Sequence, residues 1–128
     1  MQEKNNPLSP HLQIYRWQIS SLLSITHRIV GVINILAISA ICFWSLFLLL
    51  GAESYEVLNN FFNSFFGKFI AVGLCWTFSF HILNELRHLF WDMGYGFDLK
   101  ISRITGVLAL IGSFVLTILF YLIGKNIF

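Results

Sequence analysis

The sequence predicts an all-α integral membrane protein whose three transmembrane helices form part of a multi-subunit helical bundle. Its 128 residues are 57% hydrophobic and only 11% charged, with a mean hydropathy of +0.76. Charged residues make up about a quarter of an ordinary globular domain, so a soluble fold is excluded. The apolar residues also gather in three runs, each close to the ~20 residues that a helix needs to cross a bilayer. Three helices close poorly into a bundle on their own, which favours a partner subunit.

Residues 1–18 are expected to form a polar arm on the cytoplasmic or matrix side, in which Pro7 and Pro10 oppose helix formation. No cleavable signal peptide is visible, because the first apolar run starts too late and is too long. The arm is also not the Arg-rich amphipathic kind of a mitochondrial transit peptide. The sequence is therefore expected to be bacterial or already processed.

The first span is expected at residues 19–50, where Ile29–Leu50 contains no charge. Its first turns are polar and are placed in the headgroup region or against protein. The second and third spans are expected at residues 65–90 and 104–124, and the whole chain at 1–128 is a single membrane-anchor domain. Asn34, inside the first span, is expected to bond to a neighbouring helix.

Two polar connections join these spans. Gly51–Asn63 is expected to be the first, and Trp91–Arg103 the second, where Gly94 and Gly96 end the preceding helix. Basic residues favour one side of the membrane by six to two, which places the N-terminus in the cytoplasm or matrix. The six are Lys4, Arg16, Arg28, Arg87, Lys100 and Arg103, and the two are Lys68 and Lys125.

The second span carries an intramembrane histidine, His81, on a stripe with Asn84, Glu85 and His88. These positions share one helix face because they are spaced by three, four and seven residues. An ionisable group in hydrocarbon is costly and is by default a candidate for function. An imidazole on such a stripe can bind a buried metal, and haem iron is the metal most often held this way in a helix bundle.

A second cluster lies at the start of the first span, on the same side of the membrane. Ser24, His27, Arg28 and Gly31 also share a helix face. His27 and His88 are expected near the surface, with His81 about 10 Å deeper by helix rise. A haem b that lies edge-up needs such an arrangement, because its iron takes a neutral imidazole and its propionates take cationic donors.

Ser24 and Arg28 also fit a quinone head group, since a hydroxyl and a guanidinium one turn apart can bind and polarise a carbonyl. Trp91, Asp92 and Tyr95 could supply packing or proton-exchanging groups at this level. Glu85 could reach the interface, pair with an arginine, or accept a proton from an imidazole.

Other interpretations remain open on the residues alone. The arginines can be plain topology anchors, and the histidines can be solvated, as in a cofactor-free structural anchor or assembly protein. A transporter subunit could use His81 in a proton relay, but the first and third spans contain no acidic residue at mid-membrane. If haem is bound, it is five-coordinate, or it recruits His27, or another chain supplies its second ligand.

Three ordered motifs resemble the cytochrome b subunit of succinate dehydrogenase, the larger membrane anchor of respiratory complex II. They are the arm at Pro7–Tyr15, the Ser-x-x-His-Arg-x-x-Gly pattern at Ser24–Gly31, and the stretch His81–Tyr95. The resemblance covers nearly the whole chain. It departs at Asn84 and Glu85, where many relatives carry a small residue.

The resemblance implies that Ser24 and Arg28 line a quinone site and that His81 is an axial ligand of haem b. It places His27, Arg28 and His88 near the haem propionates. A smaller hydrophobic anchor would supply the second axial histidine, and a flavoprotein and an iron–sulfur subunit would dock on the cytoplasmic or matrix face. The implied location is the bacterial inner membrane, with the mitochondrial inner membrane as the alternative.

Overall fold

Four helices make up the part of the chain that the computed structural model describes, residues 17–49 and 51–127. They are α1 (Ile19–Leu48), α2 (Ala52–Asn63), α3 (Phe65–Asp92) and α4 (Leu99–Ile127), and no strand occurs among these residues. Three helical segments are long and apolar enough to cross a membrane: Ile19–Leu48, Phe65–Asp92 and Leu99–Lys125. The prediction of an all-α protein with three spans is therefore confirmed. Nearly all of the predicted arm lies outside the described residues.

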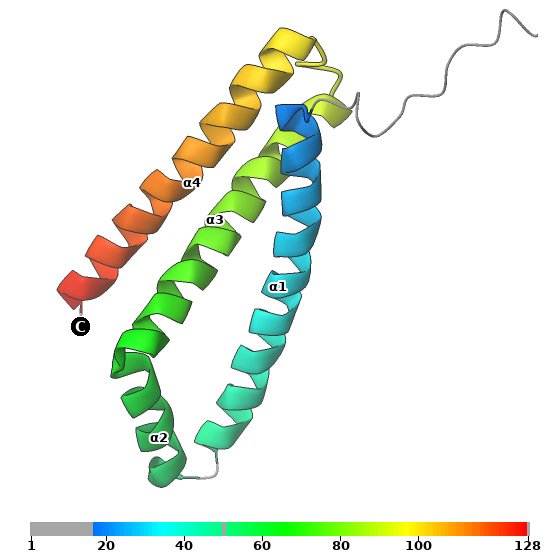
Figure 1. Ribbon diagram of the computed structural model, residues 1–128. Helices are drawn as coiled ribbons and strands as arrows, with labels where there is room; N and C mark the ends of the chain where they lie inside the picture. The colour runs from blue at the N-terminus through cyan, green and yellow to red at the C-terminus, as the bar shows by residue number, and fades with distance from the viewer. Residues whose placement is uncertain (1–16, 50, 128) are drawn as a thin grey trace, which may run out of the picture.

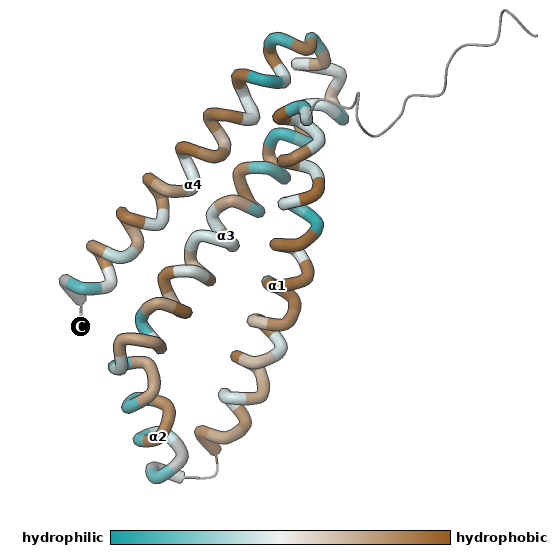
Figure 2. Tube along the Cα trace, in the orientation of Figure 1, coloured by the Kyte–Doolittle hydropathy of each residue, from teal (hydrophilic) through white to brown (hydrophobic). Residues whose placement is uncertain are grey.

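The three long helices run side by side, with α3 between α1 and α4 (Figure 1). The hydropathy colouring shows apolar residues along these helices and polar residues gathered at their ends and in α2 (Figure 2). Few side chains of α1 are buried: Leu23, Val30, Asn34 and Ala37. Large apolar side chains are exposed along all three spans, which suits contact with lipid or with another membrane subunit.

The first connection differs from the sequence-based expectation, because Ala52–Asn63 forms the helix α2 instead of an irregular polar segment. Its apolar residues recur at helical spacing, and the Phe62 ring lies 6.2 Å from the Trp44 ring of α1. The second connection is shorter than expected, since α4 begins at Leu99 rather than near residue 104. Gly94 and Gly96 have φ values of 87° and 83°, which explains why the helix ends there.

A sharp corner joins α2 to α3 at Ser64. Its backbone is extended (φ −68°, ψ 158°), and its hydroxyl oxygen accepts a hydrogen bond of 3.1 Å from the Gly67 N–H. The hydroxyl also donates to the Phe61 carbonyl at 2.5 Å. Gly67 is required here, because a Cβ at this position would overlap the backbone of Phe61 and Phe62. The corner therefore fixes where α3 begins.

The packing around α3 depends on small and polar residues. Gly106 of α4 is buried, and a Cβ there would overlap the Leu23 side chain of α1. Between α3 and α4, the hydroxyls of Thr77, Ser113 and Thr117 bond to carbonyls of their own helices, at 2.6–2.8 Å. These groups are satisfied without a partner helix, so the backbones can approach closely. Asn34 of α1 donates to the Thr77 carbonyl at 3.4 Å, which confirms its expected bond to a neighbouring helix.

Candidate functional site

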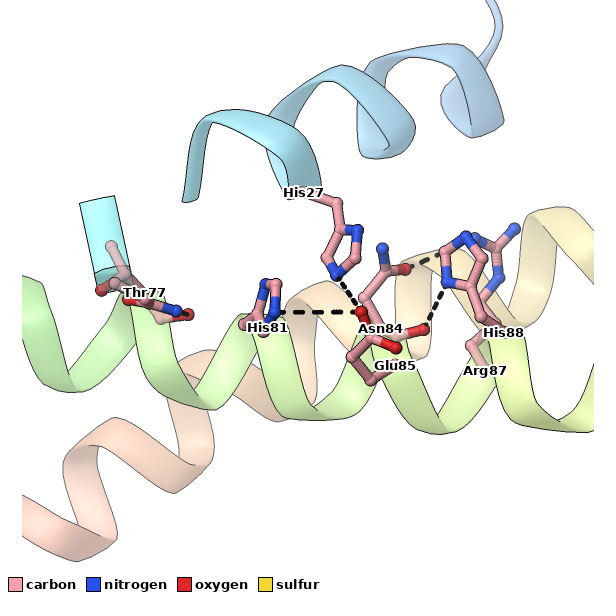
Figure 3. Close-up of polar contacts among 8 residues, drawn as sticks. His27, Thr77, His81, Asn84, Glu85, Arg87 and His88 are labelled. Atoms are coloured by element: carbon pink, nitrogen blue, oxygen red, sulfur yellow. Dashed lines mark hydrogen bonds and ion pairs between the residues drawn. The ribbon is translucent and has the colours of Figure 1, made fainter. Parts of the chain in front are cut away.

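Three imidazole rings gather where α1 and α3 meet. His27 comes from α1, and His81 and His88 lie two turns apart on α3 (Figure 3). The rings of His27 and His81 are stacked, with centroids 4.4 Å apart and planes inclined by 16°. The rings of His27 and His88 are also stacked, at 5.3 Å and 20°. His27 therefore bridges the two histidines of α3.

The predicted depth of His27 is wrong. The sequence placed it near the surface, about 10 Å from His81, because depth was counted along each helix from its polar end. In the structure its ring is in contact with His81. Counting along one helix cannot give the relative depth of two antiparallel helices, which is set by how their side chains pack.

Glu85 joins two of these imidazoles. Its Oε1 lies 3.1 Å from His27 Nε2 and 3.8 Å from His81 Nε2 (Figure 3). Of the three roles that the sequence left open, the contacts match the pairing with an imidazole; the described residues show no ion pair between Glu85 and an arginine. One donor atom from each of His27, His81 and Glu85 lies within 4.8 Å of the other two. Two imidazole nitrogens and a carboxylate oxygen form a donor set that can hold a transition metal.

The nitrogens of His81 and His88 have different surroundings. His88 Nδ1 donates to the Asn84 carbonyl at 2.7 Å, which leaves its Nε2 as the acceptor of the neutral ring. His81 Nδ1 is buried and has no hydrogen-bond partner among the described residues. The His81 ring packs against Gly31, where a Cβ would come within 3.3 Å of its Cε1 atom. Gly31 thus makes room for this imidazole between α1 and α3.

Ser24 and Arg28 lie on α1, one turn apart, near His27 in sequence. Arg28 is exposed and Ser24 is half-buried. Neither side chain has a hydrogen bond or ion pair with any residue in 17–49 or 51–127.

Arg87, which the sequence analysis counts among the basic residues that set the orientation, joins α3 to α4. Its side chain is 7% exposed and turns toward α4 rather than joining the imidazoles. Nη2 donates to the carbonyl and hydroxyl of Ser102 at 3.0 and 2.9 Å, and Nε donates to the Thr105 hydroxyl at 3.3 Å. The guanidinium carbon also lies 4.1 Å from the ring centroid of Trp91. These hydrogen bonds between α3 and α4 were not predicted from the sequence. The available signal was the pair of polar residues Ser102 and Thr105, which lie one turn apart.

The other residues that the sequence suggested near a quinone, Trp91, Asp92 and Tyr95, lie at or near the connection between α3 and α4. Trp91 donates its Nε1–H to the Gly96 carbonyl at 3.2 Å, which closes the loop. Asp92 and Tyr95 are exposed. The structure therefore brings together His27, His81, Glu85 and His88, and leaves Asp92 and Tyr95 at the surface.

Comparison with known proteins identifies the family. A family model described as the succinate dehydrogenase/fumarate reductase transmembrane subunit matches residues 2–120. The chain belongs to this family. It is similar to a succinate dehydrogenase cytochrome b556 subunit of Rickettsia felis, with 42% identity over 115 residues that cover 90% of each chain.

Two further relatives of this transmembrane subunit family come from other lineages. A cytochrome b556 subunit of Paracoccus denitrificans is 34% identical over 115 residues, covering 90% of this chain and 88% of its own. A cytochrome b560 subunit of Reclinomonas americana is 35% identical over 127 residues, covering 93% and 86%. The resemblance that the three motifs predicted is thus confirmed. Within the family's enzyme complex, this chain is the membrane subunit.

Proposed function

We propose that this chain is the haem b-binding anchor of a succinate:quinone oxidoreductase and contributes to its quinone site. The observation that carries the proposal is the contact of His27 and His81, from two membrane-spanning helices, beside the free donors of Ser24 and Arg28. Haem b, when bound, supplies one-electron redox chemistry. The succinate chemistry belongs to the flavoprotein and iron–sulfur partners, and this chain holds them at the membrane.

His81 is the proposed axial ligand of the haem iron. A neutral imidazole is the donor that haem iron takes, and a buried imidazole nitrogen without a partner carries a cost that a bound group can remove. The His81 side chain is 31% exposed in this chain, so its ring reaches the surface of the α1–α3 pair. A cofactor at that surface is open to a second subunit.

The second axial histidine is proposed to come from a smaller hydrophobic anchor. His27 does not suit this role, because it lies face to face with His81 at 4.4 Å. Two rings in stacked contact leave no space between them for an iron atom and its macrocycle. The exposed edge of His81 instead favours a second histidine ligand that would come from another chain.

His27, Arg28 and His88 are proposed to lie near the haem propionates. The planar guanidinium of Arg28 can bind a carboxylate in a bidentate manner. His88 Nδ1 bonds to the Asn84 carbonyl, and its Nε2 has no partner among the described residues. These groups would hold the propionate edge at the end of α3 that leads to the α3–α4 connection.

The quinone head group is proposed to bind at Ser24 and Arg28. The hydroxyl of Ser24 and the guanidinium of Arg28 can both donate hydrogen bonds to a quinone carbonyl oxygen. Charge builds up on that oxygen as the quinone is reduced, so the arginine stabilises the reduced state more than the starting quinone. The absence of other partners for these side chains among the described residues supports this role.

The proposed orientation places the N-terminus in the cytoplasm of a bacterial cell, in its inner membrane. The excess of basic residues at that side supports it. The flavoprotein and iron–sulfur subunits would dock on the same side, close to the imidazole cluster and the quinone site.

The test is a reduced-minus-oxidised optical spectrum of the purified complex, combined with analysis of its metals. Haem binding predicts b-type bands, and a His81→Ala variant should lose them. A cofactor-free anchor would give no such bands in the wild type. A non-haem metal held by His27, His81 and Glu85 would appear in the metal analysis without b-type bands, and would also contradict the proposal.

A further inference from the structure

Two hollows lie side by side between α3 and α4, at the end of the chain opposite the imidazole cluster. The larger has a volume of about 660 Å³ and the smaller about 430 Å³. Both are lined by the same four residues: Lys68, Val72, Thr117 and Tyr121. These four residues therefore lie between the two grooves.

The walls of both grooves are mostly apolar. On α3, Val72 lies one turn beyond Lys68 and Cys75 two turns beyond it, so all three share a helix face. Ala71 and Gly124 have small side chains or none, which leaves the larger groove open. Phe65, Phe69 and Ile118 line the smaller groove.

One end of the larger groove is positively charged. Lys68 lies in the first turn of α3 and Lys125 in the last turn of α4, and both are exposed. Both residues line the larger groove. Within residues 17–49 and 51–127, neither ammonium group has a carboxylate at ion-pair distance. The two lysines stand at the ends of membrane-spanning helices, where phospholipid headgroups lie.

We infer that this site binds one anionic phospholipid of the surrounding membrane. Lys68 and Lys125 bind the phosphate and the negatively charged headgroup, and the larger groove, which both lysines line, takes the acyl chains. A mostly apolar groove with a pair of lysines at one end matches the apolar chains and the charge of such a lipid. A neutral isoprenoid tail would fill an apolar groove but would gain nothing from the lysines.

This inference is independent of the haem and quinone roles. About 20 Å of helix separates Lys68 from His81 along α3. A lipid bound at Lys68 therefore does not contact the imidazole cluster.

The experiment is native mass spectrometry of the purified complex, reconstituted in nanodiscs of equal parts phosphatidylglycerol and phosphatidylcholine. The wild type should retain one phosphatidylglycerol in preference to phosphatidylcholine. A Lys68→Gln/Lys125→Gln variant should lose this preference, with binding weaker by about 25-fold, because each lysine near a membrane surface contributes a factor of about five. Lys100→Gln is the matched control, since Lys100 is also exposed but lies at the other end of α4.

A second variant tests the grooves without changing charge. Ala71→Phe should fill the larger groove and reduce retention of both lipids, while haem content stays at the wild-type level. Equal retention of the two lipids by the wild type would overturn the inference. So would an unchanged preference in the double lysine variant, or recovery of a quinone instead of a phospholipid from this site. Loss of haem bands with lipid retention intact would count against the proposed function alone.

Discussion

The imidazole rings of His27 and His81 lie face to face, 4.4 Å apart, although 54 residues separate them in the sequence. This contact sets the register of α1 against α3. One turn further along α1, Gly31 packs against the same His81 ring. The position of the proposed iron ligand therefore depends on α1 as well as on its own helix.

Replacing His81 with alanine should remove the haem or weaken its binding severely, because the axial imidazole is the main bond between protein and iron. The pyridine haemochrome content of the purified complex measures this. His88→Ala is the control, and it should keep a low-spin spectrum because His88 is not proposed to bind iron. Wild-type haem content and an unchanged spectrum in His81→Ala would show that another residue is the ligand.

Arg28→Leu should impair quinone reduction more than it lowers haem content. Loss of one charge-assisted donor costs on the order of 2 to 4 kcal/mol at the reacting oxygen, which is about 30-fold or more in rate. Succinate oxidation with a soluble dye should persist, because that chemistry lies in other subunits. Arg103→Leu, which also removes an exposed arginine, should leave quinone reduction intact. Normal quinone reductase activity in Arg28→Leu at matched complex levels would rule out this role.

Gly31→Val should disturb the haem, because even a Cβ at this position would lie 3.3 Å from the Cε1 of His81. The larger side chain must push the ring away or separate α1 from α3. We expect reduced haem content and shifted low-temperature EPR signals. Gly73→Val is the matched control within α3, since a Cβ at Gly73 meets nothing within 4 Å. Identical spectra of Gly31→Val and wild type would contradict the packing described here.

Arg87→Met should lower the thermal stability of the complex without removing the haem. The guanidinium bonds to Ser102 and Thr105 join α3 to α4, and hydrogen bonds to a charged group contribute about 1.5–3 kcal/mol each. After the substitution, the Thr105 hydroxyl keeps its hydrogen bond to the Ile101 carbonyl and is not left without a partner. The net loss of stability should therefore be smaller than the sum of the lost bonds, about 2–3 kcal/mol. Thermal unfolding followed at the haem absorbance measures this, with exposed Arg103→Met as the control. A loss of haem at unchanged stability would place Arg87 at the cofactor instead.

The isolated chain, expressed without partners and supplied with haem, should not form a bis-histidine haem. His27 is stacked on His81 and cannot lie across an iron atom from it. Low-temperature EPR of the purified chain shows whether it forms a bis-histidine haem without a partner subunit. A bis-histidine low-spin signal that disappears in His27→Ala would show that both ligands come from this chain, and that the second anchor is not needed for ligation.

Much of this fold could be predicted from the sequence because it depends on local patterns. The lengths of the apolar runs gave three spans, and helical spacing placed His81, Glu85 and His88 on one stripe of α3. The resemblance of three motifs gave the family. Each of these signals lies within a single stretch of the chain and needs no knowledge of how the helices pack.

What could not be predicted depends on contacts between helices. The depth of His27 relative to His81 is set by the packing of His27 and Gly31 against α3. Counting residues along α1 cannot predict it. Arg87 was counted only among the basic residues that set the membrane orientation, whereas its side chain is directed by Ser102 and Thr105 of α4. The helix α2 was missed because its polar residues masked the helical spacing of its aromatic ones.

The corner at Ser64 and Gly67 fixes the position of His81, the proposed haem ligand, along α3. About 25 Å of unbroken helix separates it from His81, so the corner sets both the depth and the rotation of that imidazole. One residue inserted between them would turn the ring by about 100°, away from His27 and out of the cluster. An insertion before the corner, between α1 and α2, leaves this distance unchanged. An insertion in the connection between α1 and α2 should therefore be tolerated, whereas one between Ser64 and His81 should not.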